Sequence, residues 1–258
     1  MSHAPLAGKT ALVTGGALRI GRAIALALAQ AGADVAITFL HSQAEATETS
    51  QEIAALGRRA VVTPCDVRSE TSVRAAVAAV TGEFGGLDLL VNNAAVFASA
   101  ALESLTLEQW DAVFETNARG PFLMAREALA HLRAAHGRIV NIGSLGATHP
   151  WAGHAHYCAS KAALHMLTQA MAKAFAPEVS VNCVAPGWIE IPESSGVSGS
   201  DVSRSAAARG QAARFAAKTP MGRNGAADEV AQAVLFFATG PHFVTGQTLA
   251  VDGGLGLS

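Results

Sequence analysis

Three polar side chains in the middle of the chain have the types and the spacing needed for proton transfer at a substrate oxygen. Tyr157, the only tyrosine, and Lys161 are four residues apart, which places them on one face of a helix if this stretch is helical. A lysine ammonium beside a phenol favours the phenolate and lowers the tyrosine pKa, which makes the phenol an acid/base group. Ser144 would then donate a hydrogen bond to the same oxygen. Together they indicate a proton-transfer site.

The segments that must position these residues alternate between short apolar runs and longer helical runs. We expect strands at 10–14, 34–39, 60–64, 87–92, 138–143, 179–184 and 248–251. We expect helices from the turn at 15–21 to about 31, and at 43–56, 69–84, 107–132, 154–175 and 226–237. Continuous apolar strands are typical of a parallel sheet covered on both faces. Seven strands and a glycine-rich turn after the first favour an α/β fold with an open, doubly wound (Rossmann-like) parallel sheet and helices on both faces, rather than an eight-stranded barrel.

Two segments depart from this regular alternation. The pair Gly120-Pro121 is expected to break the helix predicted over 107–132. Residues 192–205 are rich in Ser and Gly. We interpret 190–218 as a substrate loop or lid within a single domain that spans 1–258, with an ordinary surface insertion as the alternative.

Composition excludes several classes of function. Half of the 258 residues are hydrophobic, 15% are charged and the formal net charge is −2, which does not suggest a nucleic acid or an anionic membrane as partner. The three cysteines are odd in number, and their spacing fits neither a metal site nor a disulfide framework. Apolar runs are interrupted before about 18 residues, so no membrane span is expected. These features predict a cytoplasmic protein with reduced thiols.

The turn after the first predicted strand is the main sign of a bound cofactor. Residues 14–21 read TGGALRIG. Glycine allows close approach to a pyrophosphate, and the following helix offers free N–H groups. Its position between a strand and a helix strengthens a signal that is weak alone. The spacing is not G-x-G-x-x-G but resembles the T-G-x-x-x-G-x-G turn of the short-chain dehydrogenase/reductase family, with Arg19 in place of the middle glycine.

The resemblance to this family extends over residues 14–254. It includes the 13-residue interval between Ser144 and Tyr157, an N-N-A-A segment at 92–95 that is similar to the family's N-N-A-G motif, and the ending Asp252-Gly253-Gly254. The resemblance implies that the catalytic residues are Asn117, Ser144, Tyr157 and Lys161. Besides Tyr157 and Lys161, it implies that the cofactor contacts Gly15, Leu18, Arg19, Ile20, Gly21, His41, Ser42, Asp66, Val67, Asn93, Ala94, Ala95, Pro186, Gly187 and Ile189.

The choice of cofactor is predicted from Arg19 and from the end of the second strand. Arg19 resembles the residue found in the pteridine-reductase branch of the family and in some ketoreductases, and it can pair with the 2′-phosphate of NADP. Sites specific for NAD usually place Asp or Glu after the second strand. Here that position holds His41 and Ser42, which can both bind a phosphate. We therefore predict NADP(H).

The resemblance implies hydride transfer between the nicotinamide and a carbonyl or alcohol. In this scheme Tyr157 supplies the proton, Lys161 also holds the ribose, and Asn117 positions a water molecule. We expect the substrate to meet a mostly apolar, partly aromatic set of side chains: Leu145, His149, Trp151, His154 and Trp188.

Alternatives for the substrate, the class of function and the assembly stay open. Ser144 favours a ketone or a 3-oxoacyl-type substrate, because pteridine reductases tend to carry Asp at this position. A pteridine is the second candidate, because Arg19 favours it. A catalytically inactive nucleotide-binding sensor or scaffold is a candidate of another class. Apolar residues on several faces of the helices 107–132 and 154–175 suggest a homodimer or a homotetramer.

Overall fold

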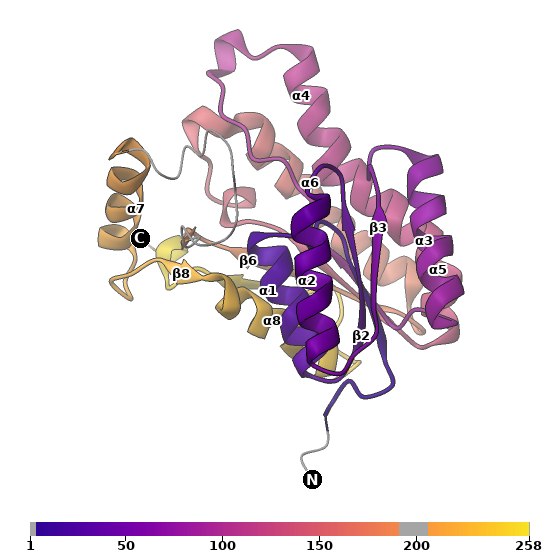
Figure 1. Cartoon of the computed structure of the whole chain (residues 1–258). Helices are drawn as coiled ribbons and strands as arrows, with labels where there is room; N and C mark the ends of the chain where they lie inside the picture. Colours follow the sequence, from indigo (N-terminus) through magenta and orange to yellow (C-terminus); the bar gives the residue numbers. More distant parts are fainter. Residues whose placement is uncertain (1–3, 191–205, 258) are drawn as a thin grey trace.

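The computed structural model describes residues 4–190 and 206–257. Its centre is a seven-stranded parallel sheet with the strand order β3-β2-β1-β4-β5-β6-β9 (Figure 1). The strands are β1 (Thr10–Val13), β2 (Asp34–Phe39), β3 (Ala60–Pro64), β4 (Leu89–Asn92), β5 (Arg138–Ile142), β6 (Ser180–Pro186) and β9 (Thr248–Val251). This confirms the predicted fold. The chain order reverses between β1 and β4, the position at which such sheets bind ligands.

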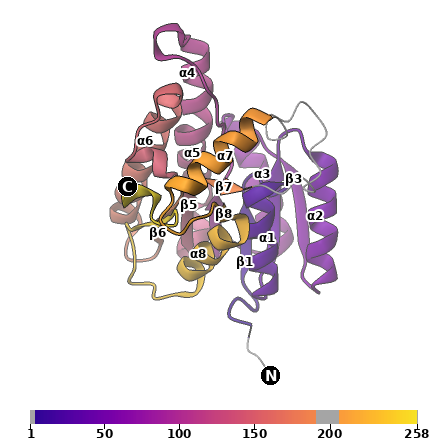
Figure 2. The ribbon, with the colours of Figure 1, turned by 90° about the vertical axis from the view of Figure 1, so that its left-hand side faces the viewer.

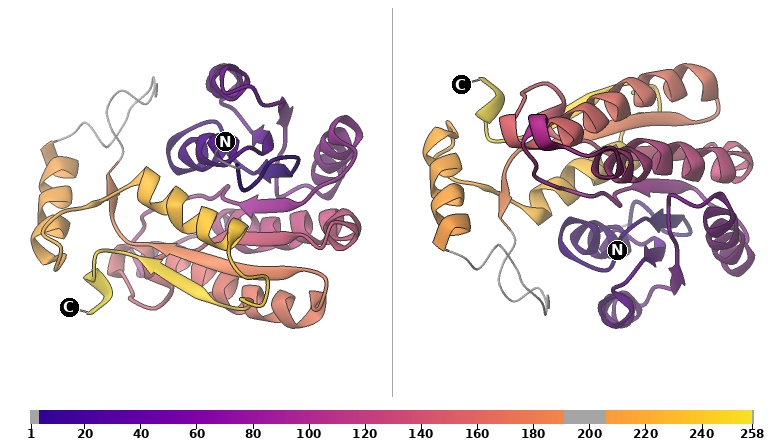
Figure 3. Two further views of the ribbon diagram at one scale, coloured as in Figure 1. Left: turned by 90° about the horizontal axis from the view of Figure 1, so that it is seen from below. Right: turned by 90° about the horizontal axis from the view of Figure 1, so that it is seen from above.

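Helices cover both faces of this sheet (Figure 3). One layer holds α1 (Arg19–Gln30), α2 (Gln43–Ala55) and α8 (Ala227–Thr239). Within this layer α1 and α8 pack directly against each other. The other layer holds α3 (Glu70–Phe84), α5 (Gly120–Ala134) and α6 (Ala155–Phe175), with α4 (Leu107–Phe114) packed against α6. The expected helices are therefore present, with ends that differ from the predicted ones by a few residues.

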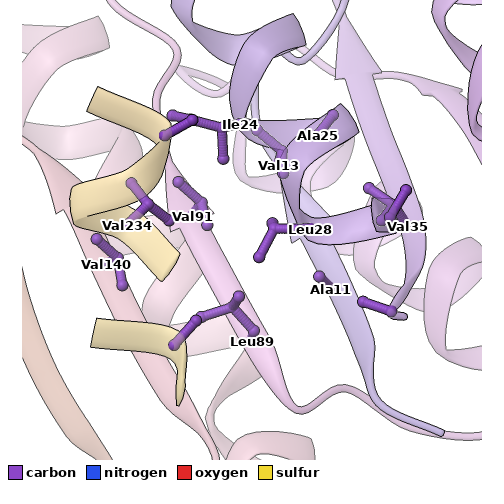
Figure 4. Close-up of a cluster of buried hydrophobic side chains, with 14 of the residues drawn as sticks. Ala11, Val13, Ile24, Ala25, Leu28, Val35, Leu89, Val91, Val140 and Val234 are labelled. Atoms are coloured by element: carbon purple, nitrogen blue, oxygen red, sulfur yellow. The ribbon is translucent and has the colours of Figure 1, made fainter. Parts of the chain in front are cut away.

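The apolar strands are continuous because each face of the sheet meets a helix layer. Val13 of β1 and Val91 of β4 point to the α1/α8 layer, where they meet Ile24, Leu28 and Val234 (Figure 4). Alternate residues of the same strands, such as Leu12 and Leu90, belong to the core of the opposite layer. Of the seven side chains named here, all are 0% exposed except Val234, which is 1% exposed, so the centre of the sheet is dry on both faces.

The helix predicted over 107–132 is one continuous helical rod with a π-helical turn at Glu115–Arg119 between α4 and α5. Pro121 has no N–H to donate to the carbonyl four residues back, that of Asn117, so the regular α-helical pattern cannot pass this point. The irregularity therefore lies just before the Gly120-Pro121 pair. It places Asn117 in the widened turn.

Residues 206–218 form a helix, α7 (Ala206–Lys218), that the sequence interpretation as a loop did not include. The segment is rich in good helix formers, but few apolar residues recur at helical spacing, so it carried no periodic signal. Figure 1 shows α7 standing apart from the main sheet, and in Figure 2, seen from that side, α7 lies in front of the other elements. Beside it, β7 (Ile189–Glu190) pairs with β8 (Gly225–Ala226). Residues 192–205, the predicted Ser- and Gly-rich loop, lie outside the described residues.

The cysteines are all buried and free of disulfides, as their odd number suggested. Burial raises the pKa of the Cys65 and Cys183 thiols to about 11, which keeps both protonated and unreactive at neutral pH. Within 4–190 and 206–257, no helix has both the length and the apolar character needed to cross a membrane.

Candidate functional site

The predicted residues gather at the carboxyl edge of the sheet. Ser144 follows β5 by two residues, and Tyr157 and Lys161 lie in the first two turns of α6. Contacts between α6 and the short 3-10 helix Leu145–Ala147 bring these two segments together. The parallel topology is the reason, because the carboxyl ends of all strands meet at one edge.

Lys161 is anchored in the interior. Its side chain is almost fully buried, and its Nζ donates a hydrogen bond of 2.7 Å to the carbonyl oxygen of Ile142, the last residue of β5. The same Nζ lies 5.9 Å from the centre of the Tyr157 ring. Burial lowers the pKa of the Lys161 ammonium to about 8, because the charged form loses its hydration.

The pKa of Tyr157 is shifted in the opposite direction to the one predicted. Burial raises it above its ordinary value, while interaction with the Ser144 hydroxyl acts in the opposite direction. The predicted lowering of the Tyr157 pKa is therefore wrong, because burial of the phenol dominates the shift. A raised pKa keeps the proton on the phenol, which is the state that a proton donor needs. Ser144 Oγ accepts a hydrogen bond of 3.0 Å from the Gly146 N–H, which leaves its own hydrogen available to donate.

Asn117 connects three parts of the site. Its Oδ1 accepts a hydrogen bond of 2.8 Å from the Val96 N–H, and its Nδ2 donates to the Val96 carbonyl at 2.9 Å and to Ser160 Oγ at 3.0 Å. The side chain therefore fixes the segment after β4 against α6. The widened helical turn explains how a buried amide reaches two separate elements.

The turns after β1 and β4 are bound to each other. Asn93 Nδ2 donates to the carbonyl oxygens of Thr14 and Gly15 at 2.9 and 3.1 Å, and Thr14 Oγ1 accepts from the N–H groups of Asn93 and Ala94. A Cβ on Gly21 would collide with the Gly15 carbonyl oxygen. Gly21 is thus required for the close packing of the first helix on the turn. Asn93 supports the turn from the side of β4, and Ala95 continues that segment.

Arg19 has a left-handed backbone. It is the first residue of α1 and has φ +54°, a region that glycine adopts easily and other residues rarely. Leu18 precedes it without a side-chain cap, and Ile20 follows, so the first turn of α1 offers its N–H groups to an anion. Arginine therefore has a backbone conformation that favours glycine, at the position where the resemblance implies a glycine.

The segments after β2 and β3 lie together. The Asp66 carboxylate accepts two hydrogen bonds from the Arg68 guanidinium, at 2.9 and 2.8 Å, and this interaction lowers the Asp66 pKa. The charge of His41 contributes to the same lowering, which places it near Asp66. Ser42 is the N-cap residue of α2, and Val67 is buried. These predicted residues thus share one end of the site.

The turn after β6 is also tightly packed. The Gly187 N–H donates to the Val251 carbonyl at 3.0 Å, and a Cβ on Gly187 would lie 2.8 Å from the Cβ of Asp252. Pro186 ends β6, and Ile189 continues into β7. The C-terminal Asp-Gly-Gly segment therefore supports the backbone beside the predicted nicotinamide position.

The predicted substrate residues lie in three places: near the C-terminus, beside Tyr157 and after β6. Leu145 and His149 lie against Gly256 near the C-terminus, and Leu145 is buried. Trp151 lies beside Tyr157, with ring centres 6.2 Å apart and planes within 10° of parallel. His154 is held by a hydrogen bond of 2.8 Å between its Nδ1 and the Ala98 carbonyl. Trp188 lies after the β6 turn.

Two aromatic residues of the site were missed by the sequence analysis. Phe97 stacks on His154 at 4.4 Å and meets the Tyr157 ring edge to face at 4.8 Å. Phe215 of α7 stacks on Trp188 at 4.3 Å. Neither belongs to a motif. The position of Phe97 directly after the segment 92–96, at a strand's carboxyl end, was the one available signal, and Phe215 carried none because α7 was not predicted.

Comparisons with known proteins cover nearly the whole chain. Residues 16–256 match the family model described as enoyl-(acyl carrier protein) reductase. The chain is 37% identical over 251 residues to the 3-oxoacyl-[acyl-carrier-protein] reductase FabG of Escherichia coli, covering 96% of this chain and 97% of that protein. It is 35% identical over 254 residues to an uncharacterized oxidoreductase of Methylorubrum extorquens, covering 97% and 98%.

Solved structures show the same similarity. A short chain dehydrogenase from Burkholderia cenocepacia, in complex with NADP, is 40% identical and superposes with a TM-score of 0.86, covering 97% of this chain and 98% of that one. A putative short-chain alcohol dehydrogenase from Sinorhizobium meliloti is 32% identical with a TM-score of 0.89, covering 99% of both chains. The similarity therefore includes sequence, fold and length.

Proposed function

The chain belongs to the short-chain dehydrogenase/reductase family, and from this premise we propose that it is an NADPH-dependent oxidoreductase that reduces a ketone or a 3-oxoacyl-type carbonyl to an alcohol. The observation that carries the proposal is the convergence of Ser144, a protonated Tyr157 and a buried Lys161 at the carboxyl edge of the sheet. A hydroxyl donor, a proton donor and a cation are the groups that carbonyl reduction requires.

Each of these residues has its own role in the reduction. When bound, NADPH supplies the hydride. The Ser144 hydroxyl donates a hydrogen bond to the carbonyl oxygen as negative charge develops on it, and the Tyr157 phenol transfers its proton to that oxygen. Lys161, with a pKa of about 8, is mostly protonated at neutral pH and stabilises the phenolate that remains. Asn117 holds the segment after β4 in place through its two hydrogen bonds to Val96.

The turn between β1 and α1 fits a dinucleotide. Gly15 has φ +62°, a Cβ on Gly21 would collide with the backbone, and the first turn of α1 has no acidic residue, which leaves the helix N-terminus suited to a pyrophosphate. Arg19, His41 and Ser42 supply the groups that would hold a 2′-phosphate. The similar chain from Burkholderia cenocepacia in complex with NADP supports this choice over NAD.

The proposal is tested by following the loss of NADPH absorbance with a panel of ketones. Wild-type protein should show turnover, and Tyr157→Phe should lower kcat by at least about 100-fold, because general acid catalysis contributes about 10²–10⁴-fold. NADPH affinity, measured separately by fluorescence, checks that the variant is folded and binds. Tight NADPH binding with no turnover of any substrate would instead support a nucleotide-binding sensor or scaffold.

Pteridine reduction remains the second candidate, because an arginine at the position of Arg19 resembles the cofactor turn of the pteridine-reductase branch. Ser144 weighs against it, since pteridine reductases tend to carry Asp at this position. A dihydropterin belongs in the same assay. A kcat/KM for the dihydropterin above that for every ketone would establish the second candidate.

A further inference from the structure

Aromatic side chains are concentrated around Tyr157. In this aromatic-poor chain, Trp151 contacts the only tyrosine, and Trp188 is connected to Trp151 through Phe215. Phe97 approaches the Tyr157 ring edge to face at 4.8 Å, and Trp151 lies nearly parallel to it at 6.2 Å. Phe97 and Trp151 also meet each other, with ring centres 6.3 Å apart and planes at 84°. The reacting phenol is therefore flanked by two flat apolar surfaces.

These surfaces are held in fixed orientations. Phe97 stacks on His154, whose Nδ1 is hydrogen-bonded to the Ala98 carbonyl, one residue beyond Phe97. Trp151 meets Phe215 of α7 at 6.4 Å, and Phe215 is stacked on Trp188. The rings thus form a connected aromatic cluster built from four separate segments, so little ordering is left to occur when a ligand binds.

Part of this cluster faces water. The Phe97 side chain is 55% exposed although its ring touches Tyr157. An exposed aromatic ring beside the proton donor gains from being covered by an apolar ligand group. Phe97 and Trp151 both contact the ring that carries the reacting hydroxyl, so a ligand group beside that hydroxyl can pack on either surface.

We propose that the substrate is a planar, aromatic cyclic ketone whose ring packs against Phe97 and Trp151, rather than a linear 3-oxoacyl chain. The inference rests on the proposed function, and it names the substrate class of that site. Rings that meet in stacked or edge-to-face geometry gain energy beyond the area that they bury. A linear chain gains no such ring–ring energy, and it loses conformational freedom when it is ordered on the same surface.

Three ketones with ten carbons separate the contribution of ring shape to kcat/KM from that of aromatic character. The bicyclic aromatic ketone 2-tetralone has both ring shape and aromatic character, the saturated 2-decalone has only ring shape, and 2-decanone has neither. We expect kcat/KM with NADPH to fall in this order. A kcat/KM for 2-decanone that equals or exceeds that for 2-tetralone would overturn the inference.

Substitution of the exposed ring identifies the surface responsible. Phe97→Leu should lower the ratio of kcat/KM for 2-tetralone over 2-decanone by about tenfold, that is, by about 1.4 kcal/mol. Trp151→Leu should lower it similarly. Phe243→Leu is the matched control, because Phe243 is fully exposed and takes no part in the cluster; it should leave the ratio unchanged. A ratio that Phe97→Leu and Trp151→Leu both leave unchanged would contradict the inference.

Failure of the proposed function is recognised separately. If none of the ketones is reduced, binding of 2-tetralone and 2-decanone to the protein with NADPH is measured by tryptophan fluorescence. Tighter binding of 2-tetralone that is weakened by Phe97→Leu would support the aromatic site while the reductase proposal fails. Equal binding of the two ketones would overturn both.

Discussion

At the scale of single residues, the site keeps two groups in states that oppose folding. Arg19 has a left-handed backbone that costs about 1–2 kcal/mol for a residue with a Cβ. Lys161 carries its amine into the interior, where the charged form is disfavoured. Both belong to the proposed cofactor and catalytic groups. Strain and buried charge at such positions are expected when a residue is retained for chemistry rather than for stability.

Substitution of Arg19 should separate backbone strain from cofactor binding. We expect Arg19→Gly to be more stable than Arg19→Ala by about 1 kcal/mol, because only glycine relieves the positive φ. Both variants should lose about 1.5–3 kcal/mol of NADPH binding, with NADH binding little changed. Urea unfolding and titrations with each nucleotide measure the two effects. Equal losses for NADPH and NADH would remove Arg19 from the choice of cofactor.

Removal of the buried amine should make stability less dependent on pH. The pKa of Lys161 is about 8 in the folded chain against an ordinary 10.5, so the unfolded chain binds more protons between these values and wild-type stability rises with pH across that window. Lys161→Met should therefore be more stable than wild type at neutral pH by about 2 kcal/mol, and this advantage should shrink as pH rises through the window.

The measurement for Lys161 is urea unfolding at several pH values. Lys173→Met on the same helix is the control for the loss of a lysine, because Lys173 is exposed. A difference between wild type and Lys161→Met that stays constant from neutral to alkaline pH would show that burial does not lower the pKa of this amine.

At the scale of elements, the site depends on hydrogen bonds that connect the segments after the strands to one another and to the helices. Asn93 binds the turn after β1 to the segment after β4, and Asn117 binds that segment to α6 through Ser160. Each contact uses a side-chain amide, partly buried at Asn93 and buried at Asn117, to satisfy backbone groups that neither helix nor strand can pair. The relative positions of the helix N-terminus, the aromatic residue Phe97 and the catalytic helix therefore depend on these two asparagines.

Glycine substitutions test the contact between the turn after β1 and the segment after β4. Gly21→Ala should destabilise the protein by about 1–3 kcal/mol and weaken NADPH binding, because its methyl group would meet the Gly15 carbonyl oxygen and lie 2.5 Å from Asn93 Nδ2. Gly82→Ala is the matched control in α3, where no atom lies within 4 Å, and it should stabilise by about 0.5–1 kcal/mol. Thermal unfolding with and without NADPH distinguishes the two. Similar behaviour of both variants would mean that the turn tolerates a side chain.

At the scale of the whole molecule, the outer helices present apolar side chains to solvent. Leu107 of α4, Phe122 of α5 and Met166 of α6 are 77%, 42% and 65% exposed. These helices pack together on one side of the sheet. Exposed apolar residues on neighbouring helices are typical of a surface that meets another subunit. They support the predicted homodimer or homotetramer as a proposal.

Assembly is tested by light scattering and sedimentation. Wild-type protein should have the mass of a dimer or a tetramer, and Met166→Glu should shift the distribution towards smaller species, because a carboxylate would be buried at the contact. Phe243→Glu is the control, since this fully exposed side chain lies on none of the three helices. A monomeric wild type would contradict the proposal.

The sequence alone determined the sheet, its helices and the order of the motifs. Runs such as Leu12 and Val13, apolar on both faces, predict a strand between two helix layers, and the turns that follow the strands come together at one edge because parallel strands share a direction. Only the tertiary structure decided the rest. The direction of the Tyr157 pKa shift depends on how much protein surrounds the phenol. The aromatic contacts of Phe97 and Phe215 join segments far apart in the chain, and no local pattern records such a distance.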